Sequence, residues 1–339
     1  MNTPKNRLIL SVSLLILMLL GYNVAISRNA AKTQRGQLLA KAEGMPLATD
    51  CIFLGNSLVE AGCDLEAFRS AWPGAQPRLR SMNLALGGTS PVEHCLILKH
   101  ALERPVRMKY LIYGFFDDQL NAPPKGGWAD LVGNRALSYH FPAASASFYA
   151  PGSSIKRIEL ELCGRLPMVA ERSSAWTKIE LLRRSLEEVG MPKKKTNRYG
   201  RVDDFSGLEA ADIKSFNERC DAVVNGRAEF SSPIQAIIKL ARDRGAKVIF
   251  VEMPMPAKHR DTFYASPSWT KMREHLESLA AGTGTFYLSA SDWITDDRKF
   301  EDATHLNEEG AKDFSAQLAA AISKIAPHSN EMAGAAARR

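Results

Sequence analysis

Short apolar runs alternate with segments of helical periodicity along this 339-residue chain, and this alternation restricts the possible fold more than any other feature. Five runs are short and apolar enough to be buried parallel strands, namely 51–55, 79–84, 110–115, 247–252 and 285–288. Apolar residues spaced by three and four predict helices over 64–71, 91–102, 233–244 and 269–280, and a last helix from Asn307 to about Ile325. Alternating strands and helices predict an α/β fold in which a doubly wound parallel sheet lies between two helical layers.

The composition is that of an ordinary globular protein, with 45% hydrophobic and 24% charged residues. This balance excludes a disordered chain, a collagen-like repeat and a membrane protein with many spans. The five cysteines are too few and too scattered for a disulfide-rich scaffold, and none lies in a Cys-x-x-Cys pair or a cluster with zinc-finger spacing. We therefore expect a sizeable hydrophobic core and neither a metal nor an organic cofactor.

The first 30 residues form a separate element. Residues 8–26 are uncharged and rich in Leu, Ile and Val, and a helix of this length nearly spans the ~30 Å hydrocarbon layer of a bilayer. Basic residues before the run favour a cytoplasmic N-terminus, although others follow it. We prefer an uncleaved signal anchor over residues 1–30, followed by a linker over 31–50; a signal peptide cleaved at Ala-Ile-Ser (25–27) is the alternative. Either interpretation puts the rest of the chain outside the cytoplasm, in a periplasm or at the cell surface.

Residues 121–229 interrupt the alternation and are expected to be an insertion of helices and loops in a domain that spans 51–326. Within it, residues 151–201 hold twelve Lys and Arg against six Asp and Glu. A solvated helical insertion is the simpler interpretation, and a basic lid that faces an anionic polymer or lipid headgroups is the alternative. Basic and aromatic residues do not interleave, so nucleic acid is not expected as a partner. Residues 327–339 are expected to be a disordered tail.

Four loops at the carboxyl ends of predicted strands carry candidate chemistry, and the first of them is Gly55-Asn56-Ser57-Leu58. A serine in a tight strand-to-helix turn exposes its hydroxyl and aims its backbone N–H at the same point. This placement suits a nucleophile with part of an oxyanion hole. Gly-Asn-Ser is also common turn chemistry, so Ser57 gains weight only from partners elsewhere in the chain.

The second and third loops offer groups that could face an oxyanion. Gly87 and Gly88 follow the second predicted strand. Glycine lets the backbone approach a ligand closely, so the N–H of Gly88 is a candidate donor. Asp117 and Asp118 follow the third strand. Two adjacent acids at a buried strand end indicate either a functional role or a cap on the next segment.

The fourth loop is Asp302-Ala-Thr-His305, which lies between the last predicted strand and the last helix. An Asp three residues before a His can hold the Nδ1–H of the imidazole and leave Nε2 to take a proton from a serine hydroxyl. The other six histidines lack such a context. Because strand ends of a doubly wound sheet meet at one edge, we expect Ser57 Oγ within about 3.5 Å of the His305 ring.

These four blocks resemble those of the SGNH (GDSL-like) hydrolase superfamily, in the same order and at the same structural positions: Gly-Asn-Ser-Leu, Asn-x4-Gly, Gly-x-x-Asp and Asp-x-x-His-Leu-Asn. The resemblance covers residues 51–120 and 233–326 approximately. It implies a flavodoxin-like α/β/α fold and ester hydrolysis or acyl transfer through a Ser–His–Asp triad. By this resemblance Ser57 is the nucleophile, His305 the general base and Asp302 its orienting partner. The backbone N–H groups of Ser57 and Gly88 would form the oxyanion hole.

The chain departs from the family pattern in two places. Asn56 stands where the family has an Asp before the serine, a change that leaves the nucleophile intact. The family's oxyanion-binding Asn is replaced by Phe116 or Asp117, depending on the alignment of the loop. An ionised Asp117 would repel a developing oxyanion, and loss of one such donor typically lowers the rate by ~10²–10³. Either another group completes the hole or the activity is weak.

Membrane-anchored sequences of this type resemble the O-acetylation proteins of bacterial exopolysaccharides, in which acyl transfer is the working reaction. That resemblance implies a carbohydrate polymer or acyl ester as substrate and a membrane acyltransferase as a candidate partner. Three alternatives stay open: a lipase or lysophospholipase of the same fold, a catalytically inactive binding module, and a structural scaffold of the cell envelope.

The uncharged run makes a prediction about location. A reporter enzyme fused after residue 50 should be active outside the cytoplasm and should sediment with membranes, because residues 8–26 would hold it there. Cell fractionation and a compartment-specific reporter assay measure this. A soluble mature protein that begins near Arg28 would instead support the cleaved signal peptide.

Overall fold

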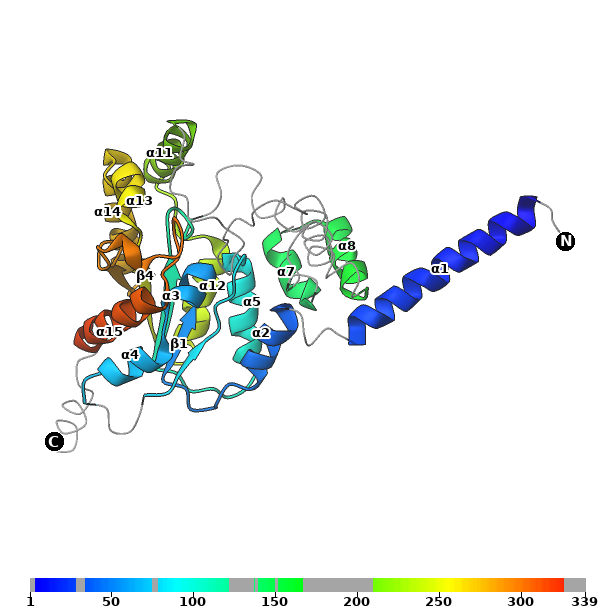
Figure 1. The fold of residues 1–339 in the computed structure, drawn as a ribbon, viewed down its shortest axis with the longest axis horizontal. Coiled ribbons are helices and arrows are strands. Elements are labelled where there is room, and N and C mark those ends of the chain that lie inside the picture. The colour runs from blue at the N-terminus through cyan, green and yellow to red at the C-terminus, as the bar shows by residue number, and fades with distance from the viewer. Residues whose placement is uncertain are drawn as a thin grey trace, which may run out of the picture. The chain divides into compact units, whose positions relative to one another are not determined.

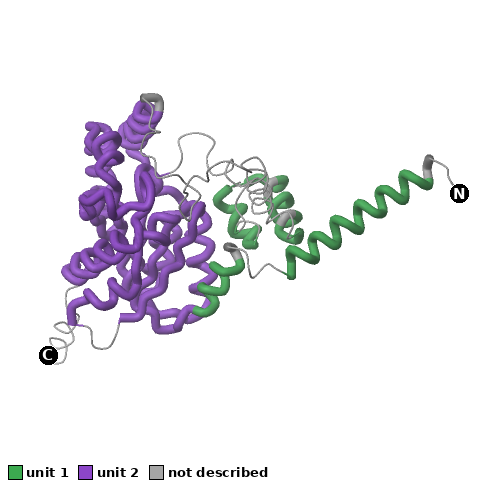
Figure 2. The backbone as a smooth tube through the Cα atoms, viewed as in Figure 1, with its two compact units in different colours: residues 1–44, 125–193 green, residues 45–124, 194–339 purple. Residues whose placement is uncertain are grey.

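The structure is a computed structural model that describes residues 4–28, 34–74, 79–121, 137, 140–149, 152–166 and 210–325. The expected tail over 327–339 and most of the basic segment over 151–201 lie outside the described residues. The chain divides into two compact units (Figure 2). Residues 1–44 and 125–193 make up the first unit, and residues 45–124 and 194–339 make up the sheet unit.

The sheet unit contains a five-stranded sheet in which every pair of neighbours is parallel and the order is β2-β1-β3-β4-β5. Its strands are β1 (Cys51–Leu54), β2 (Ser81–Asn83), β3 (Tyr110–Phe115), β4 (Lys247–Glu252) and β5 (Phe286–Ser289). This order is that of flavodoxin-like folds. The predicted fold class and all five predicted strands are therefore confirmed.

Helices cover both faces of the sheet, as right-handed connections between parallel strands require (Figure 1). On one face α5 (Pro91–Ala101) packs against α12 (Ser232–Arg242), and on the other α3 (Ser57–Gly62) and α4 (Leu65–Ala71) pack against α15 (Glu308–Ile325). Helix α14 (Pro267–Gly282) contacts β5 and α11 (Ala210–Asn225). The predicted helices are present within about two residues at most ends. Helix α3 was not predicted, because its six residues are too few to establish a period.

The three central strands are buried because helices cover them on both sides, whereas β2 and β5 at the sheet edges are half-buried. All four residues of β1 are buried, as are five of the six in β3 and in β4. Such strands read as continuous apolar runs, which is why the sequence revealed them. One exception is Glu252, which is fully buried at the carboxyl end of β4. Its carboxylate accepts hydrogen bonds from the Arg273 guanidinium (2.8 Å) and from the hydroxyls of Tyr287 (2.8 Å) and Ser289 (3.2 Å). These partners compensate the loss of water around the charge.

Two glycines let α3 lie directly on the ends of the central strands. A Cβ at Gly55, where φ is +155°, would overlap the Val59 side chain and lie 2.8 Å from the carbonyl oxygen of Gly114. A Cβ at Gly114 would overlap Val59 as well and lie 2.7 Å from the sulfur of Met253. Val59 of α3 thus occupies the space that side chains at both positions would need, and Ser57 is held close to the sheet edge.

The long excursion between β3 and β4 begins and ends at one place. Asn121 pairs with Phe230 in an isolated antiparallel bridge, and the N–H of Ser231 donates to the carbonyl of Leu120 (2.9 Å). The buried side chain of Asn121 also donates to the carbonyl of Glu229 (3.1 Å). The two ends of the excursion are therefore joined by backbone and side-chain hydrogen bonds.

The first unit contains α1 (Pro4–Arg28), α2 (Gln34–Glu43), α7 (Pro142–Tyr149) and α8 (Ser154–Gly164), of which α7 packs against α8. Residues Asn6–Arg28 of α1 have a mean hydropathy of 2.3 over their most apolar window, and none of that window is buried. Helix α1 is thus long and apolar enough to cross a membrane, the only such helix among the described residues. The predicted apolar helix over 8–26 is present; its orientation in a membrane stays a prediction.

The close approach at Gly55 makes a prediction about stability. Gly55→Ala should lower the free energy of unfolding of the full-length protein in detergent by about 1–3 kcal/mol, because Val59 and Gly114 leave no room for a methyl group. Thermal unfolding followed by circular dichroism measures the loss. Gly282→Ala is the matched control, since no atom lies within 4 Å of a Cβ there. Equal stability of the Gly55 variant and the control would contradict the packing argument.

Candidate active site

Ser57 is the first residue of α3 and follows β1 after a two-residue turn. The side chain of Asn56 caps this helix by accepting a hydrogen bond from the N–H of Leu58 (3.0 Å). Asn and Asp cap helices equally well. The replacement of the family's Asp by Asn56 therefore preserves the turn that carries Ser57.

The loop after β5 brings His305 to Ser57, although the two are 248 residues apart in the sequence. Ser57 Oγ lies 2.8 Å from Nε2 of His305, so the predicted approach within 3.5 Å is confirmed. Nδ1 of His305 lies 2.9 Å from both carboxylate oxygens of Asp302. The side chains of His305 and Asp302 are only 3% and 1% exposed. A proton on Nδ1 is thereby favoured, and Nε2 is left as the acceptor for the serine proton.

The Asp302 carboxylate also fixes its own loop. Its Oδ1 accepts hydrogen bonds from the N–H groups of Thr304 and His305, both at 2.8 Å. Burial acts to raise the pKa of Asp302, but the hydrogen bond from the His305 ring and the two backbone donors outweigh it and lower the pKa well below its ordinary value. Asp302 is therefore ionised at neutral pH, the state that stabilises an imidazolium at His305.

The glycine loop after β2 is hydrogen-bonded to the turn after β1 and to α3. The N–H of Leu86 donates to the carbonyl of Gly55 (3.3 Å), and the N–H of Gly87 donates to the Glu60 carboxylate (2.7 Å). Gly88 has φ +71°, a backbone conformation that favours glycine. The structure thus holds this loop beside the turn that carries Ser57, while the role of Gly88 as an oxyanion donor stays a prediction.

A series of hydrogen bonds between largely buried side chains also holds the loop after β2. The phenol of Tyr113 lies 2.8 Å from Nδ1 of His94, and Nε2 of His94 lies 2.8 Å from the hydroxyl of Thr89. That hydroxyl donates to the carbonyl of Leu86 (2.5 Å). One assignment satisfies all three contacts: Tyr113 donates to His94, and His94 donates to Thr89. The sequence places His94 on a predicted helix and does not indicate this role, because Tyr113 contacts His94 only in the folded chain.

Asp117 takes part in a second cluster that the sequence did not reveal. Its backbone has φ +49°, unusual for a residue other than glycine. Its carboxylate accepts a hydrogen bond from the phenol of Tyr264 (2.9 Å) and lies 3.3 Å from Nε2 of His259. Burial and the nearby Asp117 charge raise the pKa of Tyr264 far above its ordinary value, so the phenol stays protonated and donates. Whether Asp117 also faces an oxyanion stays a prediction.

His259 and Tyr264 belong to a short helical segment after β4, formed by α13 (Ala257–His259) and the π-helix η3 (Arg260–Tyr264). No motif surrounds either residue in the sequence. The one available signal is their position shortly after a predicted strand, where side chains reach the same edge of the sheet as Ser57. π-Helical turns occur frequently at functional sites.

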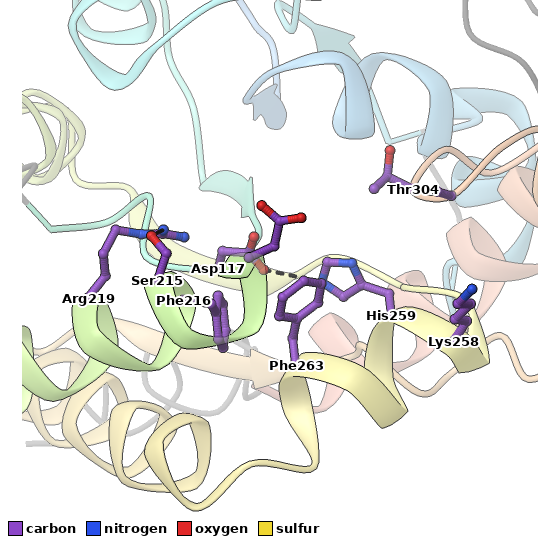
Figure 3. A pocket seen from close by; sticks show the side chains of 10 residues that line it. Asp117, Ser215, Phe216, Arg219, Lys258, His259, Phe263 and Thr304 are labelled. Atoms are coloured by element: carbon purple, nitrogen blue, oxygen red, sulfur yellow. Dashed lines mark hydrogen bonds and ion pairs between the residues drawn. The ribbon is translucent and has the colours of Figure 1, made fainter. Parts of the chain in front are cut away.

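A cavity of about 350 Å³ opens beside this cluster (Figure 3). It is lined by Asp117, Asp212, Ser215, Phe216, Arg219, Lys258, His259, Phe263, Ala303 and Thr304. Two of these, Ala303 and Thr304, come from the loop that joins Asp302 to His305. The volume falls in the range of ~300–1,000 Å³ that is typical of small-molecule pockets. Among the described residues, no group of three or more His, Cys, Asp or Glu side chains could hold a metal ion.

Comparison with known proteins gives distant structural likenesses only. No protein-family model and no curated protein sequence matches the chain. A Bacteroides fragilis protein described as an acylhydrolase superposes with a TM-score of 0.37 and 11% identity over 85% of this chain and 94% of its own. An Agrobacterium tumefaciens protein described as an arylesterase has a TM-score of 0.32 and 12% identity over 82% of this chain and 100% of its own. A Sinorhizobium meliloti carbohydrate acetylesterase has a TM-score of 0.37 and 10% identity over the same shares.

The lowered pKa of Asp302 makes a prediction about acid stability. The unfolded chain binds a proton at Asp302 near its ordinary pKa of about 3.9, whereas the folded chain does so only at lower pH. The contribution of Asp302 to stability is therefore present above about pH 4 and is lost as the pH falls through the folded pKa. The wild type should exceed Asp302→Asn in unfolding free energy at neutral pH, and the difference should narrow toward about pH 2. Chemical denaturation in a non-ionic detergent across this range measures it, and a difference that does not vary with pH would contradict it.

Proposed function

We propose that this chain is a serine-dependent esterase or O-acyltransferase of the SGNH type, which acts on carbohydrate esters outside the cytoplasm. The observation that carries the proposal is the continuous line of hydrogen bonds from the Ser57 hydroxyl through the His305 imidazole to the Asp302 carboxylate. A nucleophile, a base and an orienting carboxylate in this arrangement support acyl transfer.

In the acylation step, Nε2 of His305 takes the proton from Ser57 Oγ as the oxygen attacks the ester carbonyl carbon. Asp302 stabilises the resulting imidazolium through Nδ1–H. The tetrahedral intermediate then collapses, the bond to the leaving alkoxide breaks, and His305 returns the proton to that oxygen. The product alcohol departs and an acyl ester of Ser57 remains.

In the second step, an acceptor O–H attacks the acyl-enzyme carbonyl while Nε2 of His305 takes its proton. Collapse of this intermediate releases the Ser57 oxygen, which regains the proton from His305. Water as the acceptor gives hydrolysis, and a sugar hydroxyl gives acyl transfer. A membrane acyltransferase that supplies acyl groups would be the partner in the second case.

The oxyanion would be stabilised by the backbone N–H groups of Ser57 and Gly88. Ser57 provides one donor at the start of α3, and the bonds from Gly87 to Glu60 and from Leu86 to Gly55 support the loop of the other. The family's third donor, an Asn side chain, is replaced in this chain. Loss of such a donor lowers the rate by ~10²–10³, so we expect slow turnover of ester substrates by the wild type.

Two further features support the location and the substrate class. Helix α1 can anchor the chain in a membrane by its length and hydropathy. The described lining of the cavity beside His305 combines two phenylalanines with mostly polar and charged side chains, a combination that suits a polyhydroxylated substrate. The remaining alternatives, a binding module without activity and a structural scaffold of the cell envelope, are outcomes of the test below.

Substitution of the three proposed catalytic residues tests the function. Ser57→Ala should abolish turnover of an aryl acetate, and His305→Ala should come close to that, because the hydroxyl loses its proton acceptor. Asp302→Asn should lower the rate less than either, yet substantially, because it disturbs the tautomer and orientation of His305. Release of the chromogenic phenol measures all three, and His100→Ala on α5 serves as a control outside the site.

Mass spectrometry of the intact protein gives an independent measurement. An acyl adduct should appear at Ser57 after incubation with activated esters and should be absent from Ser57→Ala. The absence of an adduct with every activated ester would favour the inactive binding module over the enzyme.

A further inference from the structure

We propose that the cavity beside His305 is a saccharide subsite, which holds one uncharged sugar unit next to the reacting ester. The inference deepens the proposed function and rests on it, because it assigns a substrate class to that site. Its elements are Asp117 and His259 as hydrogen-bonding groups, Phe216 and Phe263 as apolar walls, and Arg219 at one end (Figure 3).

The subsite lies at the same edge of the sheet as Ser57. Asp117 follows β3, the direct neighbour of β1 in the sheet, and Ser57 follows β1. His259 lies on the segment after β4, and Thr304 lies on the loop after β5, next to His305. Four loops thus converge at the carboxyl edge of one parallel sheet, which is where ligands of such folds bind.

Two aromatic residues form the apolar part of the cavity lining. The rings of Phe216 and Phe263 lie 4.9 Å apart between centroids, at an angle of 55°. Phe216 comes from α11 and Phe263 from η3, so the two walls come from segments far apart in the sequence. Both side chains are buried, at 2% and 7% exposed, so they contribute a small apolar part to a cavity whose other side chains are mostly polar.

The polar residues provide directional hydrogen bonds to hydroxyl groups. A carboxylate such as Asp117 accepts two or more hydrogen bonds, and an imidazole such as His259 can donate or accept. Arg219 carries several N–H donors, of which Nε binds Asp118 (3.0 Å) and Nη1 binds Ser215 (3.1 Å). Neighbouring donors and acceptors of this kind match the vicinal hydroxyls of a sugar.

The charge of the lining disfavours an anionic ligand. Two cationic side chains, Arg219 and Lys258, stand against two carboxylates, Asp117 and Asp212. Arg219 is in addition paired with Asp118. A phosphate or sulfate would meet no excess positive charge here, whereas a neutral polyhydroxylated ring needs none.

Packing holds the polar groups in place before a ligand arrives. The Tyr264 phenol donates to Asp117, and the Tyr264 ring stacks on Trp269 with centroids 4.4 Å apart and planes 12° apart. The His259 ring lies 4.9 Å from the rings of both Phe263 and Tyr264. Groups that are already fixed lose little entropy on binding, so each hydrogen bond to the sugar contributes more to affinity.

The experiment compares sugar esters with an aryl ester in the full-length protein in detergent. The probes are p-nitrophenyl acetate and a panel of O-acetylated gluco-, xylo- and manno-oligosaccharides. In a second arm, p-nitrophenyl acetate is the donor and the unacetylated oligosaccharides are acceptors, with acetylated product detected by mass spectrometry. The first arm reports sugar bound as the ester, and the second reports sugar bound as the acceptor.

His259→Ala should lower kcat/KM for the active sugar arm, relative to p-nitrophenyl acetate, by about tenfold, mainly through KM. Arg219→Ala is the second variant, since its partly exposed side chain can be removed with less risk to folding. His100→Ala and Arg298→Ala are matched controls outside the cavity. They should leave the ratio of kcat/KM for the sugar arm to kcat/KM for p-nitrophenyl acetate unchanged. Thermal unfolding verifies that each variant is folded.

Three results would overturn the subsite. One is that kcat/KM for the sugar arm, relative to that for p-nitrophenyl acetate, is the same in the wild type and in both folded cavity variants. Another is that p-nitrophenyl acetate is turned over in a Ser57-dependent way but neither sugar arm shows activity. The third is a rate that rises with acyl chain length from p-nitrophenyl acetate to decanoate, which would assign the cavity to an acyl chain. Aryl acetate turnover that persists in Ser57→Ala would instead refute the proposed function, so the two failures are distinguishable.

Discussion

The parallel pairing of the five strands determines where all the chemistry of this chain lies. Each connection must cross a face of the sheet and return, so every strand ends at the same edge and delivers its following loop there. Ser57 and His305 meet across 248 residues of sequence for this reason. The glycine contacts at Gly55 and Gly114 refine the arrangement, because they let α3 approach the edge closely enough for a hydrogen bond from Ser57 to the imidazole.

Hydrogen bonds from side chains to backbone then fix the loops that the sheet brings together. Asn56 caps α3, Glu60 holds the N–H of Gly87, and Asp302 holds the N–H groups of Thr304 and His305. Each of these residues satisfies a backbone donor that burial would otherwise leave unpaired. The same bonds keep the site organised in the absence of substrate, and this lowers the reorganisation that a reaction would require.

Features that depend on local pattern could be predicted from the sequence, and features that depend on the fold could not. The strands were visible as apolar runs, and the three-residue spacing of Asp302 and His305 is short enough to identify them as a pair from the sequence alone. Ser57 became a credible candidate nucleophile because a candidate base, His305, was recognisable elsewhere in the chain. In contrast, His259, Tyr264 and His94 meet their partners only through tertiary contacts. Asp117 is 142 residues from His259 and 147 residues from Tyr264 in the sequence. Helix α3 escaped prediction because a single turn and a half has no detectable period.

The bridge between Asn121 and Phe230 has a consequence for how this kind of chain can change over evolutionary time. Because the excursion begins and ends at one hydrogen-bonded point, the ends of the chain that enter the sheet are held together there. Loop-closure entropy grows only with the logarithm of length, so doubling the excursion would cost about 0.6 kcal/mol. Residues 125–193, the part of the excursion outside the sheet unit, could be exchanged or lengthened while the strand order, α11 and the catalytic edge persist. Residues 125–193 are thus a replaceable module, and a lineage could acquire a new partner there without a change in its catalytic chemistry.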